Sequence, residues 1–309
     1  MKQNIIFKCF IILFLVVSSL ANAQKQLVVV SQNTKTPIAF ATIKTAKTAG
    51  FYTNELGQFT LQDSIKSITI NCLGFEQQTL SINTLQDTIK MQEKPIPIPE
   101  IVVRETAEKS LEIPLKKRNK SFGSLLLNSK QELILVANPY KAVAGRKINR
   151  INGLIKKHFF MKHAKKVRVK KQLLGSKTVI RLNIYTVKDG FFADKIYSSK
   201  ALKIATFYGE SFSIDLSKEN IYFAKEGLAF AIEYIGNVSP NKKISYKNQH
   251  IRPAAVSKQN KYYKAKTYLK YTFKNLEHIV PINDLINSNL PKGVKPNFDI
   301  NLNFGFVLD

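Results

Sequence analysis

The sequence is poor in cysteine, with only Cys9 and Cys72 among 309 residues. Cys9 lies in a segment with the features of a signal peptide, so Cys72 would stand alone in the exported chain. A single cysteine excludes an intrachain disulfide and a thiolate zinc site. Ile68, Ile70 and Cys72 follow the two-residue period of a strand, and Cys72 has no His or Lys beside it in the sequence. We therefore expect Cys72 to be a small core residue and not a reactive thiol.

Motifs of common active sites are also missing. There is no Gly-x-Ser-x-Gly elbow, no glycine loop for a phosphate and no acidic ladder for calcium. His158 and His163 are five residues apart, off the i,i+4 face used by helical zinc sites, which favours two surface histidines. Asp215 and Glu233 could form a glycosidase pair, but we expect them on different strands. The sequence predicts no catalytic residue, no metal and no cofactor.

Beyond the N-terminus, no stretch approaches the 18 apolar residues of a membrane span. At the N-terminus, Lys2 precedes an apolar run over 5–17 that Lys8 interrupts, and small residues precede a cleavage position between Ala23 and Gln24. We predict a secretory signal peptide over 1–23; the alternative is a membrane anchor, for which the run is short. The product would be exported to the periplasm, associated with the outer membrane, or secreted.

Acidic residues are scarce, since 21 Asp and Glu face 48 Lys and Arg, for a net charge of +27. Such an excess attracts anionic partners at low salt. Most of it lies beyond residue 94, in two stretches that mix lysine with histidine or tyrosine. The candidate residues for an anionic partner are Lys165, Lys166, Arg168, Lys170, Lys171, Lys261, Tyr262, Tyr263 and Lys264. Interleaved lysine and tyrosine suit a polyanion. On a strand, the same alternation gives a basic outer face and an aromatic inner face, which is the interpretation we prefer.

Short β-rich segments make up most of the rest of the chain. Seven of them recur every 8 to 12 residues over 24–93, which predicts a compact β-sandwich. They are 27–30, 38–43, 51–53, 58–61, 67–72, 78–82 and 88–91. The polar turn Asn54-Glu55-Leu56-Gly57 separates two of them and predicts a β-hairpin in which Gly57 has a positive φ.

The region 94–120 is predicted to be a linker. It opens with Lys94-Pro95-Ile96-Pro97-Ile98-Pro99, an alternation that favours an extended polyproline strut, and it ends in the basic Lys116-Lys117-Arg118. We interpret the charged part as a solvated connector; docking to acidic lipid or polysaccharide is the alternative.

The region 121–309 is predicted to be a second β-sandwich, jelly-roll-like. The predicted strands are 178–187, 211–216, 227–235, 268–273 and 298–306. Between them the pattern around 148–171 is ambiguous. Ile148, Ile151, Ile155 and Phe159 have nearly helical spacing, whereas Val167 and Val169 alternate as in a strand. The predicted class is all-β, with two sandwiches joined by a proline-rich linker.

Three pieces of the first predicted sandwich carry a family resemblance. The strings 35–43, 50–61 and 70–76 resemble, in order and spacing, the carboxypeptidase regulatory-like domain. The resemblance implies a prealbumin-like sandwich without catalytic residues. Similar modules precede the plug of TonB-dependent transporters, but the 205 residues after Arg104 are too few for a plug and a large barrel. The strings 181–185, 214–217 and 230–234 resemble an uncharacterised exported β-sandwich module, which implies no function.

The expected function is that of an exported, non-enzymatic binding or assembly protein of the cell envelope, with an envelope protein or glycan as its partner. One alternative is an envelope hydrolase with Asp215, Glu233 or His250 converging in a pocket of 121–309. The other is an anionic-polymer binder, acting on glycan or nucleic acid through the basic C-terminal part.

Overall fold

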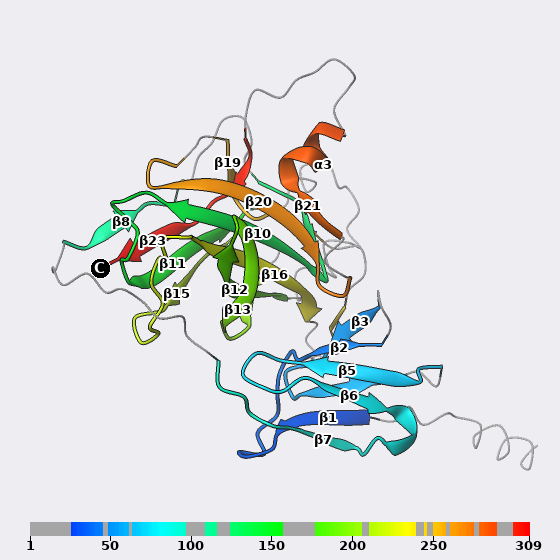
Figure 1. Ribbon diagram of the computed structural model, residues 1–309. Helices are drawn as coiled ribbons and strands as arrows, with labels where there is room; N and C mark the ends of the chain where they lie inside the picture. Colours follow the sequence, from blue (N-terminus) through cyan, green and yellow to red (C-terminus); the bar gives the residue numbers. More distant parts are fainter. Residues whose placement is uncertain are drawn as a thin grey trace, which may run out of the picture.

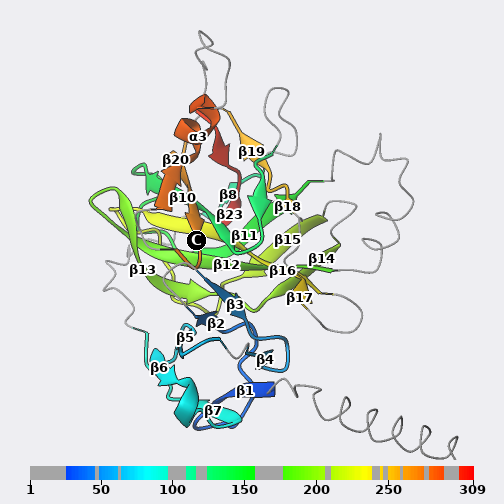
Figure 2. The ribbon, with the colours of Figure 1, turned by 90° about the vertical axis from the view of Figure 1, so that its right-hand side faces the viewer.

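The computed structural model describes residues 26–45, 49–61, 64–96, 109–115, 124–156, 177–205, 210–238, 244–245, 250–257, 260–274, 278–288 and 299–309. This part of the chain is almost all β-structure in several sheets whose strand pairs are antiparallel, except for the parallel pair of the segments 26–31 and 88–91, and this confirms the predicted all-β sandwich class. It forms the N-terminal sandwich (26–96) and the C-terminal sandwich (109–309), which lie against each other in Figures 1 and 2. The predicted signal peptide with Ala23 and Gln24, and the linker residues 97–108 and 116–120, lie outside the described residues. None of the helices in the described ranges is long and apolar enough to cross a membrane.

The N-terminal sandwich contains all seven predicted strands. They are β1 (Gln26–Ser31), β2 (Thr42–Lys44), β3 (Gly50–Tyr52), β4 (Gln58–Thr60), β5 (Ser67–Asn71), β6 (Gln78–Ser81) and β7 (Thr88–Met91), with a 3-10 turn η1 (Ile82–Thr84). The sheet β4-β1-β7 packs on the sheet β3-β2-β5-β6. Alternate residues of both sheets, such as Val29 and Ile70, are fully buried between them, because successive side chains of a strand point to opposite faces.

The predicted hairpin between β3 and β4 is wrong, although its turn has the predicted conformation. Gly57 has a φ of 68°, and Asn54 Oδ1 accepts hydrogen bonds from the backbone N–H groups of Leu56 and Gln58 at 2.9 and 2.8 Å. However, β3 pairs with β2, whereas β4 pairs with β1 in the other sheet. The turn is tied to β1 by the 2.9 Å bond from Val29 N–H to the Gly57 carbonyl. It therefore carries the chain from one sheet to the other.

The C-terminal sandwich is built on a large sheet and a small sheet. The large sheet has the order β13-β12-β16-β10-β20-β21, with β14 also paired to β12 and β17 to β16. Its strands are β10 (Gln131–Pro139), β12 (Lys177–Lys188), β13 (Phe191–Ser198), β14 (Leu202–Ala205), β16 (Leu228–Val238), β17 (Ile244–Ser245), β20 (Tyr263–Tyr271) and β21 (Ile279–Pro281). The small sheet has the order β15-β11-β23-β8. Its strands are β8 (Leu111–Ile113), β11 (Ile148–Ile155), β15 (Glu210–Asp215) and β23 (Gly305–Leu308). The remaining elements are the pairs β9 (Leu127–Asn128) with β18 (His250–Ile251) and β19 (Ala255–Val256) with β22 (Asn301–Leu302), and the helix α3 (Ile282–Ser288).

One segment differs from the sequence predictions, and in a second the structure decides between two alternatives that the sequence left open. Leu111–Ile113, predicted as linker, form β8 and pair with β23, so the small sheet begins inside 94–120. Ile148, Ile151 and Ile155, with nearly helical spacing, lie instead on strand β11. The register of β11 against β23 shifts between Ile148 and Arg150, a bulge that changes which residues share a face. All three isoleucines are consequently buried in one strand.

The two faces of the large sheet pack against different partners. Along β16, Leu228, Phe230 and Ile232 face the small sheet and bury the main core. The intervening residues of β16 face the other way, and its end near Ile235 packs against the N-terminal sandwich. The contact comprises Phe40, Tyr52, Val179, Ile235, Val238 and Phe273. A Cβ built at Gly50 would lie 2.1 Å from the Phe273 ring, so β3 and this ring are in direct contact. The face of the large sheet that packs against the N-terminal sandwich also carries the candidate functional site described below.

Candidate functional site

Two carboxylates lie side by side on the face of the large sheet that meets the N-terminal sandwich. Glu132 of β10 and Glu233 of β16 are directly opposite each other in the antiparallel register, and both are almost fully buried. Asn183 of β12 connects them, because its Nδ2 donates to Glu132 Oε1 at 2.6 Å and to Glu233 Oε2 at 2.9 Å. Burial of two such groups requires that their charges be compensated nearby.

Arg181 of β12 compensates Glu233. Its Nε and Nη2 lie 3.0 and 2.9 Å from Glu233 Oε2. Burial is the largest single influence and would raise the pKa of Glu233. The Arg181 guanidinium, Lys195 and the hydrogen bonds from Asn183 and Tyr52 together more than offset burial and hold this pKa well below its ordinary value. Glu233 is therefore an ionised carboxylate in the folded protein.

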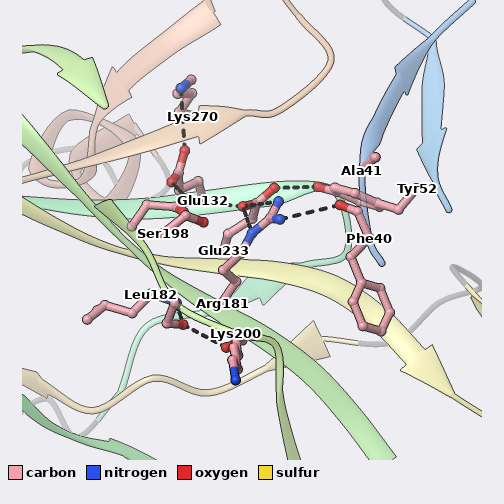
Figure 3. Close-up of polar contacts among 12 residues, drawn as sticks. Phe40, Ala41, Tyr52, Glu132, Arg181, Leu182, Ser198, Lys200, Glu233 and Lys270 are labelled. Atoms are coloured by element: carbon pink, nitrogen blue, oxygen red, sulfur yellow. Dashed lines mark hydrogen bonds and ion pairs between the residues drawn. The ribbon is translucent and has the colours of Figure 1, made fainter. Parts of the chain in front are cut away.

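The same ion pair reaches into the N-terminal sandwich. The Tyr52 hydroxyl donates to Glu233 Oε1 at 2.8 Å, and Arg181 Nη1 donates to the Phe40 carbonyl at 3.3 Å, as Figure 3 shows. Phe40 has a φ of 55°, a left-handed conformation that is uncommon outside glycine. We call Tyr52, the Phe40 carbonyl, Arg181 and Glu233 the interdomain latch, since each sandwich contributes two of its members.

Glu132 is compensated on the other side of the network. The Tyr185 hydroxyl lies 2.7 and 2.8 Å from its two oxygens, and Lys270 Nζ lies 3.4 Å from Oε2. Burial raises the pKa of Tyr185, and the charge of Glu132 raises it further. With Arg181 on Glu233 and Lys270 on Glu132, the two carboxylates and two cations balance, and each carboxylate oxygen already accepts at least one interaction.

A cleft of about 940 Å³ opens beside this network, between the two sandwiches. Cations from both sandwiches line it, together with Asp194, the two compensated glutamates and a few hydroxyl and amide side chains. Its charged lining residues are Lys44, Lys94, Glu132, Arg181, Asp194, Lys195, Glu233, Lys270 and Lys274. Lys195 of β13 is half-buried, and burial lowers the pKa of its ammonium. The Lys195 ammonium lies over the Tyr185 ring, whose centroid is 5.5 Å from Nζ.

Cys72 occupies a different place from the one predicted. It comes directly after β5, packs partly against the N-terminal core and also lines the cleft. Burial raises the pKa of its thiol above the ordinary value, even though Arg181 and Lys195 act in the opposite direction. The side chain is therefore half-buried and protonated at neutral pH.

The described members of the predicted basic and aromatic set lie on and next to β20. Tyr263 is buried in the main core and Lys264 beside it is exposed, as the preferred alternation predicts for this pair, but Tyr268 lies on the same face of the strand as Lys264. Lys261 is exposed and lies 4.9 Å from the ring centroid of half-buried Tyr262. None of the four lines the cleft. Lys165, Lys166, Arg168, Lys170 and Lys171, and also His158 and His163, lie outside the described residues.

The predicted acid pair does not come together. Asp215 ends β15 in the small sheet, is exposed and accepts a hydrogen bond from Ser217 N–H at 2.9 Å, whereas Glu233 faces away from that sheet. His250 pairs with Asn128 in β18–β9 and does not line the cleft. Glu233 instead meets Glu132, which the sequence analysis did not select. Within the described ranges, no group of three or more His, Cys, Asp or Glu side chains could hold a metal ion.

Glu132, Arg181 and Lys270 belong to the candidate site but were not among the residues predicted from the sequence. Arg181 and Glu233 interrupt the apolar runs of β12 and β16, and Glu132 directly precedes the apolar run of β10. Charged residues of opposite sign in otherwise apolar strands need partners, and this was the signal that could have found the network. Comparison of the chain with protein-family models, with curated proteins and with solved structures gives no match.

Proposed function

We propose that this protein is an exported, non-enzymatic binding or assembly protein of the cell envelope, in which the regulatory-like N-terminal sandwich is docked on the C-terminal one. One observation supports this proposal above all: Glu233 is held by Arg181 of its own sandwich and by Tyr52 of the other. An ionised carboxylate with these donors joins two domains. A general acid, in contrast, needs a raised pKa.

The experiment is an activity screen with a structural control. The purified chain is incubated with peptide and oligosaccharide mixtures, and the products are followed by mass spectrometry. We expect no cleavage by the natural chain. Cleavage that is abolished in a folded Glu132→Gln variant would overturn the proposal. Fractionation of cells that produce the chain tests export separately, and a product confined to the cytoplasm would contradict it.

A second candidate, an envelope glycosidase, is favoured by the proximity of Glu132 and Glu233. Because both accept a hydrogen bond from Asn183 Nδ2, their nearest oxygens cannot be farther apart than the sum of 2.6 and 2.9 Å. Retaining glycosidases hold their two carboxyl groups about 5–5.5 Å apart. The ion pair on Glu233 and the two tyrosine hydroxyls on the carboxylates weigh against this candidate. The oligosaccharide arm of the same screen decides between the two.

A further inference from the structure

The charges that line the cleft do not cancel. Glu233 is neutralised by Arg181 and Glu132 by Lys270, at 2.9 and 3.4 Å. The acid that then remains is Asp194. The cations that remain are Lys44, Lys94, Lys195 and Lys274. The cleft is therefore positive, and its walls of low dielectric concentrate that field.

The remaining lysines come from both sandwiches. Lys44 lies on β2 and Lys94 follows β7, whereas Lys195 lies on β13 and Lys274 follows β20. Docking of the two sandwiches brings these like charges to one cavity, which is unfavourable when the cavity holds only water. An anion bound there would reduce the repulsion between the sandwiches, so binding and docking should stabilise each other.

Lys195 marks the inner part of the cleft. Its side chain is half-buried, and no acidic side chain of the described residues lies within ion-pair distance of its ammonium. Glu233 and Glu132 act on this ammonium only from beyond contact distance. A half-buried cation without an acid in contact is expensive, and a ligand anion would supply that contact.

The remaining lining favours a sugar over a nucleic acid base. Thr42, Asn71 and Ser198 place hydroxyl and amide groups between the cations. Tyr185 is the one aromatic residue among the described lining residues, and both Lys195 and Lys270 lie about 5 Å from its ring centroid, at 5.5 and 5.1 Å. Binding of single-stranded nucleic acid depends on open aromatic faces for base stacking. The cleft offers donors for sugar hydroxyls and carboxylates instead, within the 300–1,000 Å³ range of ligand pockets.

We propose that the cleft between the two sandwiches is the binding site of an acidic glycan, with Lys44, Lys94, Lys195 and Lys274 facing its carboxylate or sulfate groups. This proposal rests on the proposed binding function and assigns it a ligand class and a place. It also moves the anionic-partner site away from Lys261–Lys264.

Calorimetric titration of the full chain tests the proposal with four probes: an oligogalacturonide, a sulfated heparin tetrasaccharide, a neutral maltotetraose and a single-stranded oligonucleotide. We expect binding of at least one acidic oligosaccharide, tenfold or more tighter than that of maltotetraose. The two acidic probes distinguish carboxylate from sulfate. Their affinity should fall with added salt, because cations of the protein replace counterions of the ligand.

Matched variants locate the site. Lys195→Gln with Lys274→Gln should weaken binding of the acidic probe about tenfold or more and reduce its salt dependence. Lys261→Gln with Lys264→Gln removes the same charge outside the cleft and should change affinity less than twofold. If the first pair fails to fold, Lys44→Gln with Lys94→Gln replaces it, since Lys94 is exposed and Lys44 is half-exposed. Equal effects of the cleft and control pairs would overturn the proposal.

Cys72 gives a second measurement that does not depend on variants. It lines the cleft, so a bound acidic oligosaccharide should slow its alkylation at least threefold, read by mass spectrometry of the peptide that contains it. Unchanged alkylation at saturating ligand contradicts a cleft site, as does tighter binding of the oligonucleotide than of both acidic sugars. An acidic sugar that is bound and also cleaved would overturn the non-enzymatic function but retain the site. Absence of both binding and cleavage removes the site and leaves the non-enzymatic function standing.

Discussion

The interdomain latch makes a strong prediction for Glu233→Gln. The substitution keeps the size and shape of the side chain but removes the charge that Arg181 faces at 2.9 Å. The guanidinium then stays in a site where the natural side chain is about nine-tenths buried, and only uncharged acceptors, the new amide oxygen and the Phe40 carbonyl, remain as its partners. Removal of one member of a buried ion pair costs about 3–5 kcal/mol, because the other charge is left uncompensated.

The assay is equilibrium unfolding in urea, with thermal unfolding as a second measurement. A loss of 3 kcal/mol should lower the Tm by roughly 6–12 °C, at about 2–4 °C per kcal/mol for a unit of this size. The matched control is the triple variant Tyr52→Phe, Arg181→Met and Glu233→Leu, which removes the polar partners together. Apolar replacement of a whole buried ion pair is commonly neutral or stabilising, so the triple variant should be more stable than Glu233→Gln. A Glu233→Gln variant within about 1 kcal/mol of the natural chain would refute the reasoning.

The same variant has a characteristic pH dependence. The pKa of Glu233 is depressed in the folded protein, whereas in the unfolded chain it is about 4.3. Its contribution to stability is therefore present above about pH 4.3 and is lost as the pH falls through the folded-state pKa. Stability of the natural chain should decrease below about pH 5, and that of Glu233→Gln should decrease less steeply. If the free energies of unfolding of the two proteins changed in parallel with pH, Glu233 would not be the source of this acid sensitivity.

Three further predictions concern other parts of the fold. Gly57→Ala should cost about 1–2 kcal/mol or more in urea unfolding, because φ is 68° and the new Cβ would lie 2.6 Å from the Val29 carbonyl oxygen; Gly190→Ala, with a φ of 75° and open space, should cost less. Phe230→Ala should destabilise the C-terminal sandwich by about 3–5 kcal/mol, measured by the same method, since Phe230 is fully buried. Burial raises the pKa of Tyr52, with a contribution from Glu233, so the stabilising effect of the neutral hydroxyl is complete below about pH 10 and is lost at higher pH. The free energy of unfolding of Tyr52→Phe should therefore decrease less steeply above about pH 10 than that of the natural chain. Equal slopes of the two unfolding free energies against pH would contradict this.

The β-strands could be predicted from the sequence largely because alternation is a local signal. Each strand of the N-terminal sandwich carries its own period-two pattern between turn residues, and all seven were found. The pairing of strands is not local. Asn54 and Gly57 specify a turn geometry, but whether β4 pairs with β3 or with β1 depends on which faces must be buried. In this chain the Val29 N–H donates a hydrogen bond to the Gly57 carbonyl, and β4 pairs with β1. The bulge in β11 likewise breaks the two-residue period of its isoleucines, which is why their spacing in the sequence was ambiguous.

The candidate site could not be predicted from the sequence either, because its residues are brought together by non-local contacts. Tyr52 and Glu233 are 181 residues apart, and no local pattern indicates that one sandwich docks on that face of the other. Asp215 and Glu233 looked equivalent in the sequence, yet they lie on different sheets. The sequence does contain an isolated charged residue in each of the apolar strands β10, β12 and β16. Which of these charges compensate one another depends on the order of the strands in the large sheet, and the sequence does not show that order.

The latch and the cleft depend on each other through charge. Removal of the Glu233 carboxylate makes the cleft more positive: at roughly 8 Å and an effective dielectric constant of about 20, a newly uncompensated Arg181 would attract an anion by about 2 kcal/mol. The same change costs the latch about 3–5 kcal/mol, and Lys44 and Lys94 face Lys195 only when the sandwiches are docked. The loss of stability in the latch is thus larger than the gain in attraction for an anion and opposes it. Geometry of docking, and not the amount of positive charge, therefore decides whether the cleft exists as a binding site.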